Sequence, residues 1–138
     1  MEQIQKVTIK ALVVKENKVL FVKDNHNLWE LPGGTMKQGE TEEETLRREL
    51  GEELNIDEAN IGKLISSGSF IVLKPEWDKK YAYTAKIYEA EFNIQNAKLS
   101  DEHVEMKWFS SEEISNINTR EIYRNASKIV FDQLSSNT

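Results

Sequence analysis

Three glutamates in the middle of the chain have a spacing that could bind a metal ion. Glu52 and Glu53 follow Glu49 by three and four positions. In a helix this spacing places the three carboxylates on one face. Hard divalent cations prefer such clusters of carboxylate oxygens. A double glycine, Gly33-Gly34, precedes this segment and allows backbone angles that are closed to other residues. The spacing therefore predicts a divalent-metal site where a glycine turn meets an acidic helix.

The same glutamates could instead form a solvated surface. Like charges on an exposed helix cost only about 0.2–0.5 kcal/mol per pair, and Arg48 could pair with Glu44 or Glu52 at helical spacing. At an effective dielectric near 20, two carboxylates roughly 6 Å apart repel by about 3 kcal/mol, and a bound divalent ion turns this repulsion into attraction. Burial of the glutamates in a cleft would therefore favour the metal site.

The helix that carries these glutamates, residues 42–54, has recognisable ends. Thr41 followed by Glu44 is a capping-box pattern, and Asn55 stands where a left-handed residue ends a helix. On the face away from the carboxylates, an apolar stripe is formed by Leu46, Leu50 and Leu54. We expect these leucines to be buried.

Strands are expected on both sides of this helix. The strand-forming stretches cover residues 7–14, 18–23, 63–73, 81–92 and 106–109. Glu16-Asn17 separates the first two stretches and predicts either a hairpin or two adjacent strands. Ser110 with Glu113 repeats the capping pattern. A final helix is predicted by a buried stripe of Ile122, Ile129, Val130 and Leu134. This order predicts an α/β fold with a mixed sheet covered by helices.

Composition limits the function classes. The 138 residues suit a single domain, 1–138. A net charge of −6 gives no basic surface for polymeric nucleic acid, and no apolar run approaches the ~20 residues that cross a bilayer. The absence of cysteine removes disulfides and sulfur-bound zinc and fits a reducing compartment. We therefore expect a cytoplasmic protein that has neither polymeric nucleic acid nor a membrane as partner.

The acidic residues belong to a longer pattern of fixed spacing. Gly34 is followed after five residues by Glu40, and after seven more by Arg48-Glu49-Leu50-Gly51-Glu52-Glu53. This arrangement resembles the signature box of the Nudix hydrolases. The family pattern ends in glycine and an aliphatic residue, whereas this chain has Asn55 before Ile56. The departure falls at the helix end and changes no charged position.

The resemblance implies a fold, a reaction and a cofactor. The fold would be the family's α/β/α sandwich with a mixed β-sheet. The reaction would be hydrolysis of a nucleoside diphosphate linked to another group, by attack of water at phosphorus, with Mg²⁺ or alternatively Mn²⁺ as cofactor. Oxygen ligands in a chain without cysteine favour the same hard metals. Ions about 3.5–4 Å apart can activate water and stabilise the departing phosphate.

The resemblance also implies roles for residues of the box. Glu52 and Glu53 would bind metal, and Glu49 would be another ligand or the base that deprotonates water. Arg48 would orient these carboxylates, because its planar guanidinium can hold a carboxylate by two hydrogen bonds. The Gly33 carbonyl would give the metal one more oxygen.

Two further glutamates each have a functional and a purely structural interpretation. Glu40 would support the site, although a carboxylate near a helix start is also stabilised by the helix dipole alone. Residues 101–109 resemble a segment that brings another glutamate to the metals in many family members. We prefer Glu102 over Glu105 for that role, because a loop position gives more freedom to reach the site. A solvated loop charge is the alternative.

Aromatic residues outside the box could contact the substrate. Trp77 and Tyr81 could stack on a nucleobase, an attraction of about 1–3 kcal/mol per base in single-strand systems, or they could anchor a loop. Trp29 and Trp108 are flanked by apolar residues and are expected in the core. The two histidines have no ligand spacing, so neither is assigned to a metal.

The expected function is Mg²⁺-dependent hydrolysis of a small nucleotide, with a nucleoside triphosphate converted to monophosphate and pyrophosphate. The preference for triphosphates rests on the compact chain, which has no obvious extra domain to recognise a bulky second half. An NDP-sugar, ADP-ribose or a dinucleoside polyphosphate is an alternative substrate, and a non-catalytic nucleotide sensor of the same fold is an alternative function. A protein-interaction role for the acidic helix leaves the double glycine unexplained. A homodimer is compatible with the sequence.

Overall fold

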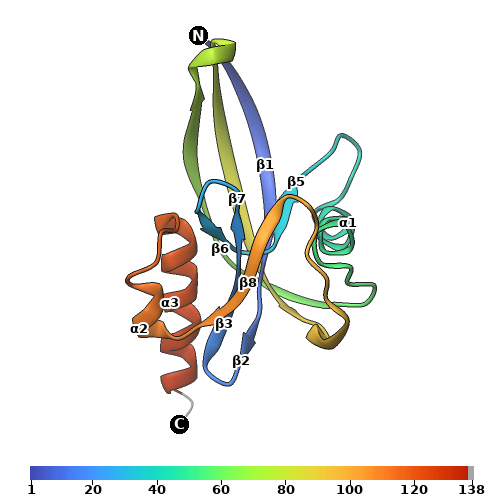
Figure 1. The fold of residues 1–138 in the computed structure, drawn as a ribbon, viewed down its shortest axis with the longest axis vertical. Coiled ribbons are helices and arrows are strands. Elements are labelled where there is room, and N and C mark those ends of the chain that lie inside the picture. The colour runs from blue at the N-terminus through green and yellow to red at the C-terminus, as the bar shows by residue number, and fades with distance from the viewer. Residues whose placement is uncertain (137–138) are drawn as a thin grey trace.

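A computed structural model describes residues 1–136 and shows two small β-sheets with helices packed against them (Figure 1). The strands are β1 (Glu2–Leu12), β2 (Val14–Lys15), β3 (Lys18–Asp24), β4 (Trp29–Glu30), β5 (Gly33–Thr35), β6 (Asn60–Lys74), β7 (Lys79–Glu91) and β8 (His103–Phe109). The helices are α1 (Glu42–Leu54), α2 (Ser111–Ile114) and α3 (Glu121–Ser136), with short 3-10 turns η1 (Pro75–Trp77) and η2 (Ile94–Asn96). The predicted α/β fold is confirmed.

The first sheet is mixed, as predicted, and a second sheet stands beside it. The first has the order β5-β1-β7-β6, with β1 parallel to β7 and the other pairs antiparallel. In the second sheet, β3 pairs antiparallel with β2, β4 and β8. The expected hairpin turn lies between β2 and β3, where Glu16 and Asn17 have φ angles of 53° and 61°. Two positive φ angles are typical of a two-residue hairpin turn.

Helix α1 begins and ends as the sequence predicts. The Thr41 side chain accepts a hydrogen bond from the Glu44 N–H, and the Glu44 carboxylate accepts one from the Thr41 N–H, which completes the capping box. Asn55 ends the helix in the left-handed region, with φ 57° and ψ 36°. The predicted stripe is completely buried and consists of Leu46, Leu50 and Leu54. Local signals therefore fix both the length and the rotation of α1.

Helix α3 exposes part of the stripe that the sequence predicts to be buried. Ile129 and Leu134 are 37% and 36% exposed, so this part of the prediction is wrong. Val130 of the predicted stripe is buried, together with Tyr123, Ala126 and Ser127, which the pattern does not include. Two of these are small residues, which let a helix lie close to a sheet, whereas the sequence pattern emphasises large apolar residues. Neither α3 nor any other described helix is long and apolar enough to span a membrane.

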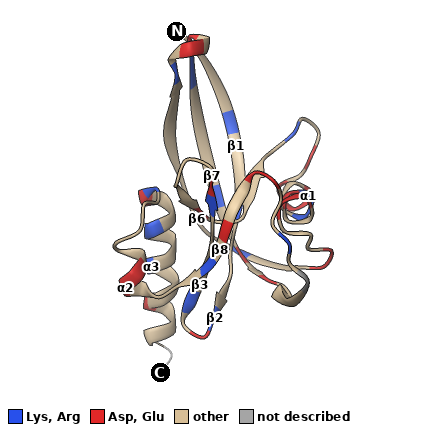
Figure 2. Ribbon diagram, viewed as in Figure 1, with Lys and Arg blue, Asp and Glu red and all other residues tan. Residues whose placement is uncertain are grey.

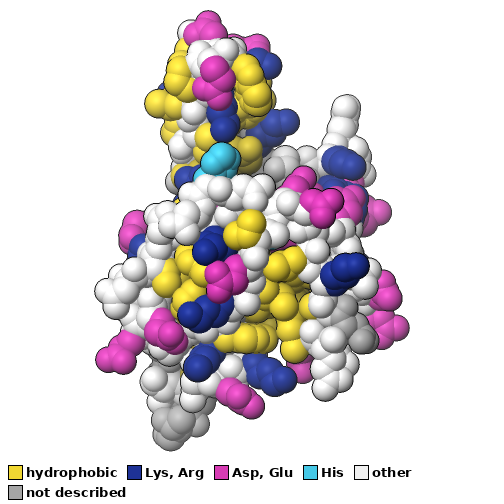
Figure 3. Space-filling model, in the orientation of Figure 1, with side chains coloured by type: hydrophobic (Ala, Val, Ile, Leu, Met, Phe, Trp, Pro, Cys, Tyr) yellow, Lys and Arg dark blue, Asp and Glu magenta, His cyan; other side chains and the backbone are white. Residues whose placement is uncertain are grey.

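Three strands extend beyond the helices as an arm (Figure 1). In this arm, residues 2–6 of β1 and 70–74 of β6 both pair with 79–83 of β7. The turn η1 forms its tip, and Trp77 there is 61% exposed. Figure 3 shows apolar side chains on the surface of the arm, in agreement with the exposure of Ile71 and Leu73. At the other end, the strands enter the body and form one wall of a cavity.

Candidate active site

A cavity of about 530 Å³ lies where α1, the base of the arm and the start of α3 meet. Its lining includes five residues that the sequence analysis selects: Gly33, Gly34, Glu49, Glu53 and Glu102. They come from β5, from α1 and from the segment before β8. The fold therefore brings together residues that are far apart in the sequence. Figure 2 shows that acidic residues gather over α1 on this side of the molecule.

The double glycine lets the backbone of β5 approach both β1 and the carboxylates of α1. Gly33 has a φ of +136°, and a Cβ at this position would lie 2.1 Å from the Ile9 carbonyl oxygen. A Cβ on Gly34 would lie 2.3 Å from Oε2 of Glu49. Gly33 contacts rigid backbone at a positive φ, so only glycine fits there, whereas a side chain on Gly34 would require the end of the Glu49 side chain to move.

Glu53 is the most deeply buried carboxylate of the site, with 7% of the residue exposed. Its Oε1 accepts a hydrogen bond of 3.2 Å from the Gly33 N–H, and its Oε2 lies 3.7 Å from Nε2 of His103. Burial raises the pKa of Glu53 to about 8, although the Lys10 charge and the Gly33 N–H oppose this shift. A carboxylate in this environment is stabilised in its charged form by a nearby cation.

Arg48 connects the carboxylates around the cavity rim. Its guanidinium donates to both Glu40 oxygens, at 2.6 and 2.9 Å, and to Oε1 of Glu49 at 2.8 Å. It also donates to Oε2 of Glu52 at 3.3 Å and to the Thr35 carbonyl at 3.0 Å. The hydrogen bond from Arg48 lowers the pKa of Glu40 to about 2. Paired charges of this kind hold side chains in defined positions.

The glutamates of α1 do not all face the cavity. Glu49 and Glu53 line it, whereas the Glu52 side chain is 58% exposed and contacts Arg48 at the rim. Among residues 1–136, no three His, Cys, Asp or Glu side chains form a ready-made metal-binding group. The donors nevertheless suit a hard divalent ion, because the Gly33 carbonyl and two carboxylates supply only oxygen. The buried Glu53 carboxylate is the part of this set that most requires a cation.

The segment before β8 places Glu102 and His103 at the cavity. Strand β8 begins at His103, three residues earlier than predicted, so Glu102 directly precedes it and lines the cavity. Glu105 instead forms an ion pair of 3.2 Å with Lys23. The His103 side chain is nearly buried, and its Nδ1 has no hydrogen-bond partner among the described residues. The sequence analysis prefers Glu102 for this side of the site but assigns no role to His103, whose position depends on the pairing of β8 with β3.

The opposite wall consists of residues that the sequence analysis does not select. The Phe70 and Tyr83 rings are stacked with centroids 5.1 Å apart, and the Arg120 guanidinium lies 4.1 Å from the Phe70 centroid. Buried Nε of Arg120 and the Tyr123 hydroxyl have no hydrogen-bond partner within residues 1–136. Lys10 also lines this wall. Of these residues, Lys10 has a sequence signal, since it is the one charged residue of the predicted strand 7–14.

The structure does not bring Trp77 and Tyr81 to the cavity. Trp77 lies at the tip of the arm, where the Lys74 ammonium is 6.0 Å from its ring centroid. Tyr81 pairs with Ile4 and Val72 further along the arm. Neither is among the residues that line the cavity. Phe70 and Tyr83 pair at the level of the cavity, and the strands continue past it, so Tyr81 and then Trp77 lie nearer the tip of the arm.

The expected core tryptophans are only partly buried. Trp29 packs against the hydrophobic cluster that contains the buried apolar residues of α3, and Trp108 packs against the cluster that contains the leucines of α1. The Trp29 ring makes an edge contact with Phe109, with centroids 4.8 Å apart. Both residues therefore lie at the margin of the core.

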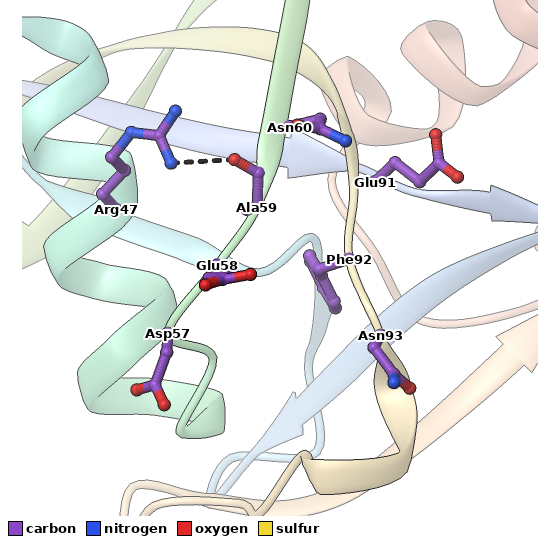
Figure 4. A pocket seen from close by; sticks show the side chains of 8 residues that line it. All are labelled: Arg47, Asp57, Glu58, Ala59, Asn60, Glu91, Phe92 and Asn93. Atoms are coloured by element: carbon purple, nitrogen blue, oxygen red, sulfur yellow. Dashed lines mark hydrogen bonds between the residues drawn. The ribbon is translucent and has the colours of Figure 1, made fainter.

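A second hollow, of about 620 Å³, lies near the C-terminal end of α1 (Figure 4). Asp57, Glu58 and Glu91 line it, and all three are exposed. Arg47 donates a hydrogen bond of 2.8 Å to the Ala59 carbonyl at its edge. This hollow contains none of the predicted site residues and no buried carboxylate. The first cavity is therefore the candidate active site.

Comparison with known proteins establishes the family. The NUDIX domain model matches residues 5–131, so the chain belongs to this family and is a Nudix hydrolase. The resemblance read from the glycine turn and the acidic helix is thereby confirmed. No curated protein is significantly similar to the chain.

Several solved structures share the fold. The MutT protein from Methanosarcina mazei Go1 is 26% identical, with a TM-score of 0.77 and 98% of each chain covered. The MutT NUDIX hydrolase from Burkholderia pseudomallei is 20% identical, with a TM-score of 0.70, covering 92% of this chain and 98% of that one. The dihydroneopterin triphosphate pyrophosphohydrolase of E. coli is 16% identical, with a TM-score of 0.69 and 96% of each chain covered.

Proposed function

We propose that this chain hydrolyses the pyrophosphate linkage of a small nucleotide in a divalent-metal-dependent reaction. The expected substrate is a nucleoside triphosphate, with monophosphate and pyrophosphate as products. The observation that carries the proposal is the Glu53 carboxylate, which is buried in the cavity and hydrogen-bonded to the Gly33 N–H. A buried carboxylate beside further glutamates fits a site that takes up a divalent cation.

In this proposal, Glu53, Glu49 and the Gly33 carbonyl would hold Mg²⁺, with Mn²⁺ as the alternative. Such an ion, when bound, lowers the pKa of water and neutralises phosphate charge. Glu52 would complete the ligand set from the rim, where Arg48 contacts it. Glu49, when it is not a ligand, would accept the proton of the attacking water, and its hydrogen bond with Arg48 would keep it oriented.

Glu102 would approach the reaction centre from the segment before β8. It lines the cavity and directly precedes β8, so its side chain can turn without disturbing the sheet. We propose it as a further catalytic carboxylate. Glu40 would act through Arg48, which it contacts by two hydrogen bonds.

The second wall of the cavity would receive the rest of the nucleotide. Tyr83 and Phe70 offer aromatic surface, and Arg120 offers a planar cation whose Nε–H has no partner in the part of the chain that the structure describes. Flat bases stack on such groups, and phosphate oxygens accept hydrogen bonds from arginine. The name of the E. coli relative, a triphosphate pyrophosphohydrolase, supports a triphosphate as the first substrate to test.

A substrate panel tests this function. Nucleoside triphosphates, NDP-sugars, ADP-ribose and dinucleoside polyphosphates are incubated with Mg²⁺ or Mn²⁺, with EDTA as the metal-free control. We expect metal-dependent release of monophosphate and pyrophosphate from a triphosphate, and loss of this turnover in both Glu53→Gln and Glu52→Gln. Binding without turnover across the whole panel would contradict the proposal and favour a nucleotide sensor. Cytoplasmic location, a single domain and a homodimer remain predictions from the sequence.

A further inference from the structure

A buried lysine stands beside the proposed metal ligands. Lys10 is 5% exposed, and its position opposite Gly33 in the β1–β5 pairing places it next to that residue's carbonyl. Its ammonium donates a hydrogen bond of 3.4 Å to the Gly33 carbonyl oxygen. The Tyr123 ring centroid lies 5.8 Å from Nζ. A cation therefore already contacts one of the oxygens that the proposed function assigns to a metal.

The surroundings of Lys10 keep it charged. Burial alone would lower its pKa, but Tyr123 and nearby carboxylates raise the pKa above its ordinary value; these carboxylates belong to Glu30, Glu53 and Glu49. Among residues 1–136, none of these carboxylates is within ion-pair distance of Nζ. Lys10 therefore acts on the cluster through space and contacts it directly only through the Gly33 carbonyl.

We propose that the Lys10 ammonium is an internal counter-ion of the carboxylate site and competes with the divalent metal ion for it. This inference rests on the proposed function, in which Gly33, Glu49 and Glu53 bind the metal. In the metal-free protein the ammonium supplies positive charge to buried Glu53. A divalent ion at the Gly33 carbonyl would repel the ammonium and displace it from this oxygen. Lys10 thus weakens metal binding in the absence of substrate.

The test measures Mn²⁺ affinity without any nucleotide. Free Mn²⁺ is followed by electron paramagnetic resonance during titration of wild type, Lys10→Met and Lys10→Gln. Because both variants remove the charge, we expect both to bind Mn²⁺ about tenfold more tightly, which corresponds to ~1.4 kcal/mol. Wild-type or weaker affinity in both variants would overturn the proposal. Tighter binding by Lys10→Met alone would also overturn it, because packing and not charge would then be the cause.

Lys86→Met is the matched control. Lys86 is another partly buried lysine, paired with Glu42 at 2.7 Å, and it does not line the cavity. Its removal should leave Mn²⁺ affinity unchanged. An equal gain in this control would show a general effect of net charge and would overturn the assignment to Lys10.

Two further measurements separate the possible failures. If Glu53→Gln binds Mn²⁺ as wild type does, the proposed metal site itself fails. If Glu53→Gln binds weakly but the Lys10 variants match wild type, only the counter-ion proposal fails. The rise in Tm on addition of Mn²⁺ gives a readout that tolerates destabilised variants. We expect a larger rise in the Lys10 variants than in wild type, and an equal or smaller rise would contradict the proposal.

Discussion

At the scale of single residues, the two glycines of β5 have different neighbours. A side chain on Gly33 would meet the Ile9 backbone, which cannot move without disturbing β1, whereas one on Gly34 would meet the end of the Glu49 side chain. Gly33 also has a positive φ of 136°, which adds strain in any other residue. Gly33 therefore matters first for folding and Gly34 for the position of a carboxylate.

This difference predicts the effect of two substitutions. Gly33→Ala should destabilise the fold by more than ~2 kcal/mol. Gly34→Ala should change stability by less than about 1 kcal/mol but lower kcat at least ~10-fold, because Glu49 must move. Urea unfolding and steady-state kinetics measure both quantities. A Gly34→Ala enzyme with wild-type kcat would remove Glu49 from the catalytic group.

The contact between Glu40 and Arg48 predicts a pH dependence of stability. The pKa of Glu40 falls from 4.5 to about 2 in the folded protein, chiefly through the hydrogen bond from Arg48. A lowered carboxyl pKa stabilises the folded state fully above the unfolded value, and this contribution disappears as the pH falls toward the folded value. Wild type should therefore have a higher Tm than Glu40→Gln above pH 4.5.

The measurement is the Tm of both proteins in metal-free buffer between pH 7 and about 2. The difference between them should shrink as the pH approaches about 2. A constant difference over the whole range would contradict this prediction, because it would show that Glu40 contributes by packing and not by its charge.

At the scale of elements, α1 ends at Asn55, where the family pattern has glycine. Substitutions at this position test whether the asparagine affects stability or catalysis. Asn55 has a φ of 57°, which glycine adopts freely and alanine does not. Asn55→Gly should leave stability within ~0.5 kcal/mol and kcat unchanged, and Asn55→Ala should cost about 1 kcal/mol in urea unfolding. A large loss of kcat in Asn55→Gly would mean that the asparagine side chain has a role in the reaction.

The arm provides a second prediction at this scale. Trp77 lies at its exposed tip, whereas Tyr83 and Arg120 line the cavity. Tyr83→Ala and Arg120→Ala should each raise KM about 5- to 100-fold, as expected for the loss of ~1–3 kcal/mol of stacking or charged contact. Trp77→Ala serves as the control and should leave KM within about twofold. An equal rise in KM for Trp77→Ala would place substrate on the arm.

Elements with local signals are predictable from the sequence, and elements set by tertiary pairing are not. The ends of α1 follow from Thr41, Glu44 and Asn55, whose side chains or backbone form the caps themselves. The start of β8 depends on pairing with β3, and the buried face of α3 depends on how closely it packs against the sheets. Neither interaction is visible in a single segment.

At the scale of the whole molecule, one wall of the cavity is predictable from local sequence signals and the other depends on tertiary pairing. The carboxylate wall comes mainly from β5 and α1, which are close in the sequence, so its residues can be recognised by spacing. The opposite wall collects Lys10, Phe70, Tyr83 and Arg120 from β1, β6, β7 and the start of α3. These residues become neighbours through contacts between distant segments: β1 pairs in parallel with β7, Phe70 of β6 pairs with Tyr83 of β7, and Arg120 lies over the Phe70 ring. The sequence therefore predicts the proposed chemistry better than it predicts substrate recognition.

The central claim is that a divalent ion binds between the glycine turn and α1. The direct measurement is paramagnetic broadening of backbone amide signals by substoichiometric Mn²⁺ in the nucleotide-free protein. The account predicts that residues 33–35 and 49–53 lose intensity first, and that Glu53→Gln abolishes this effect. Broadening centred on Asp57, Glu58 and Glu91, with the glycine turn unaffected, would contradict it.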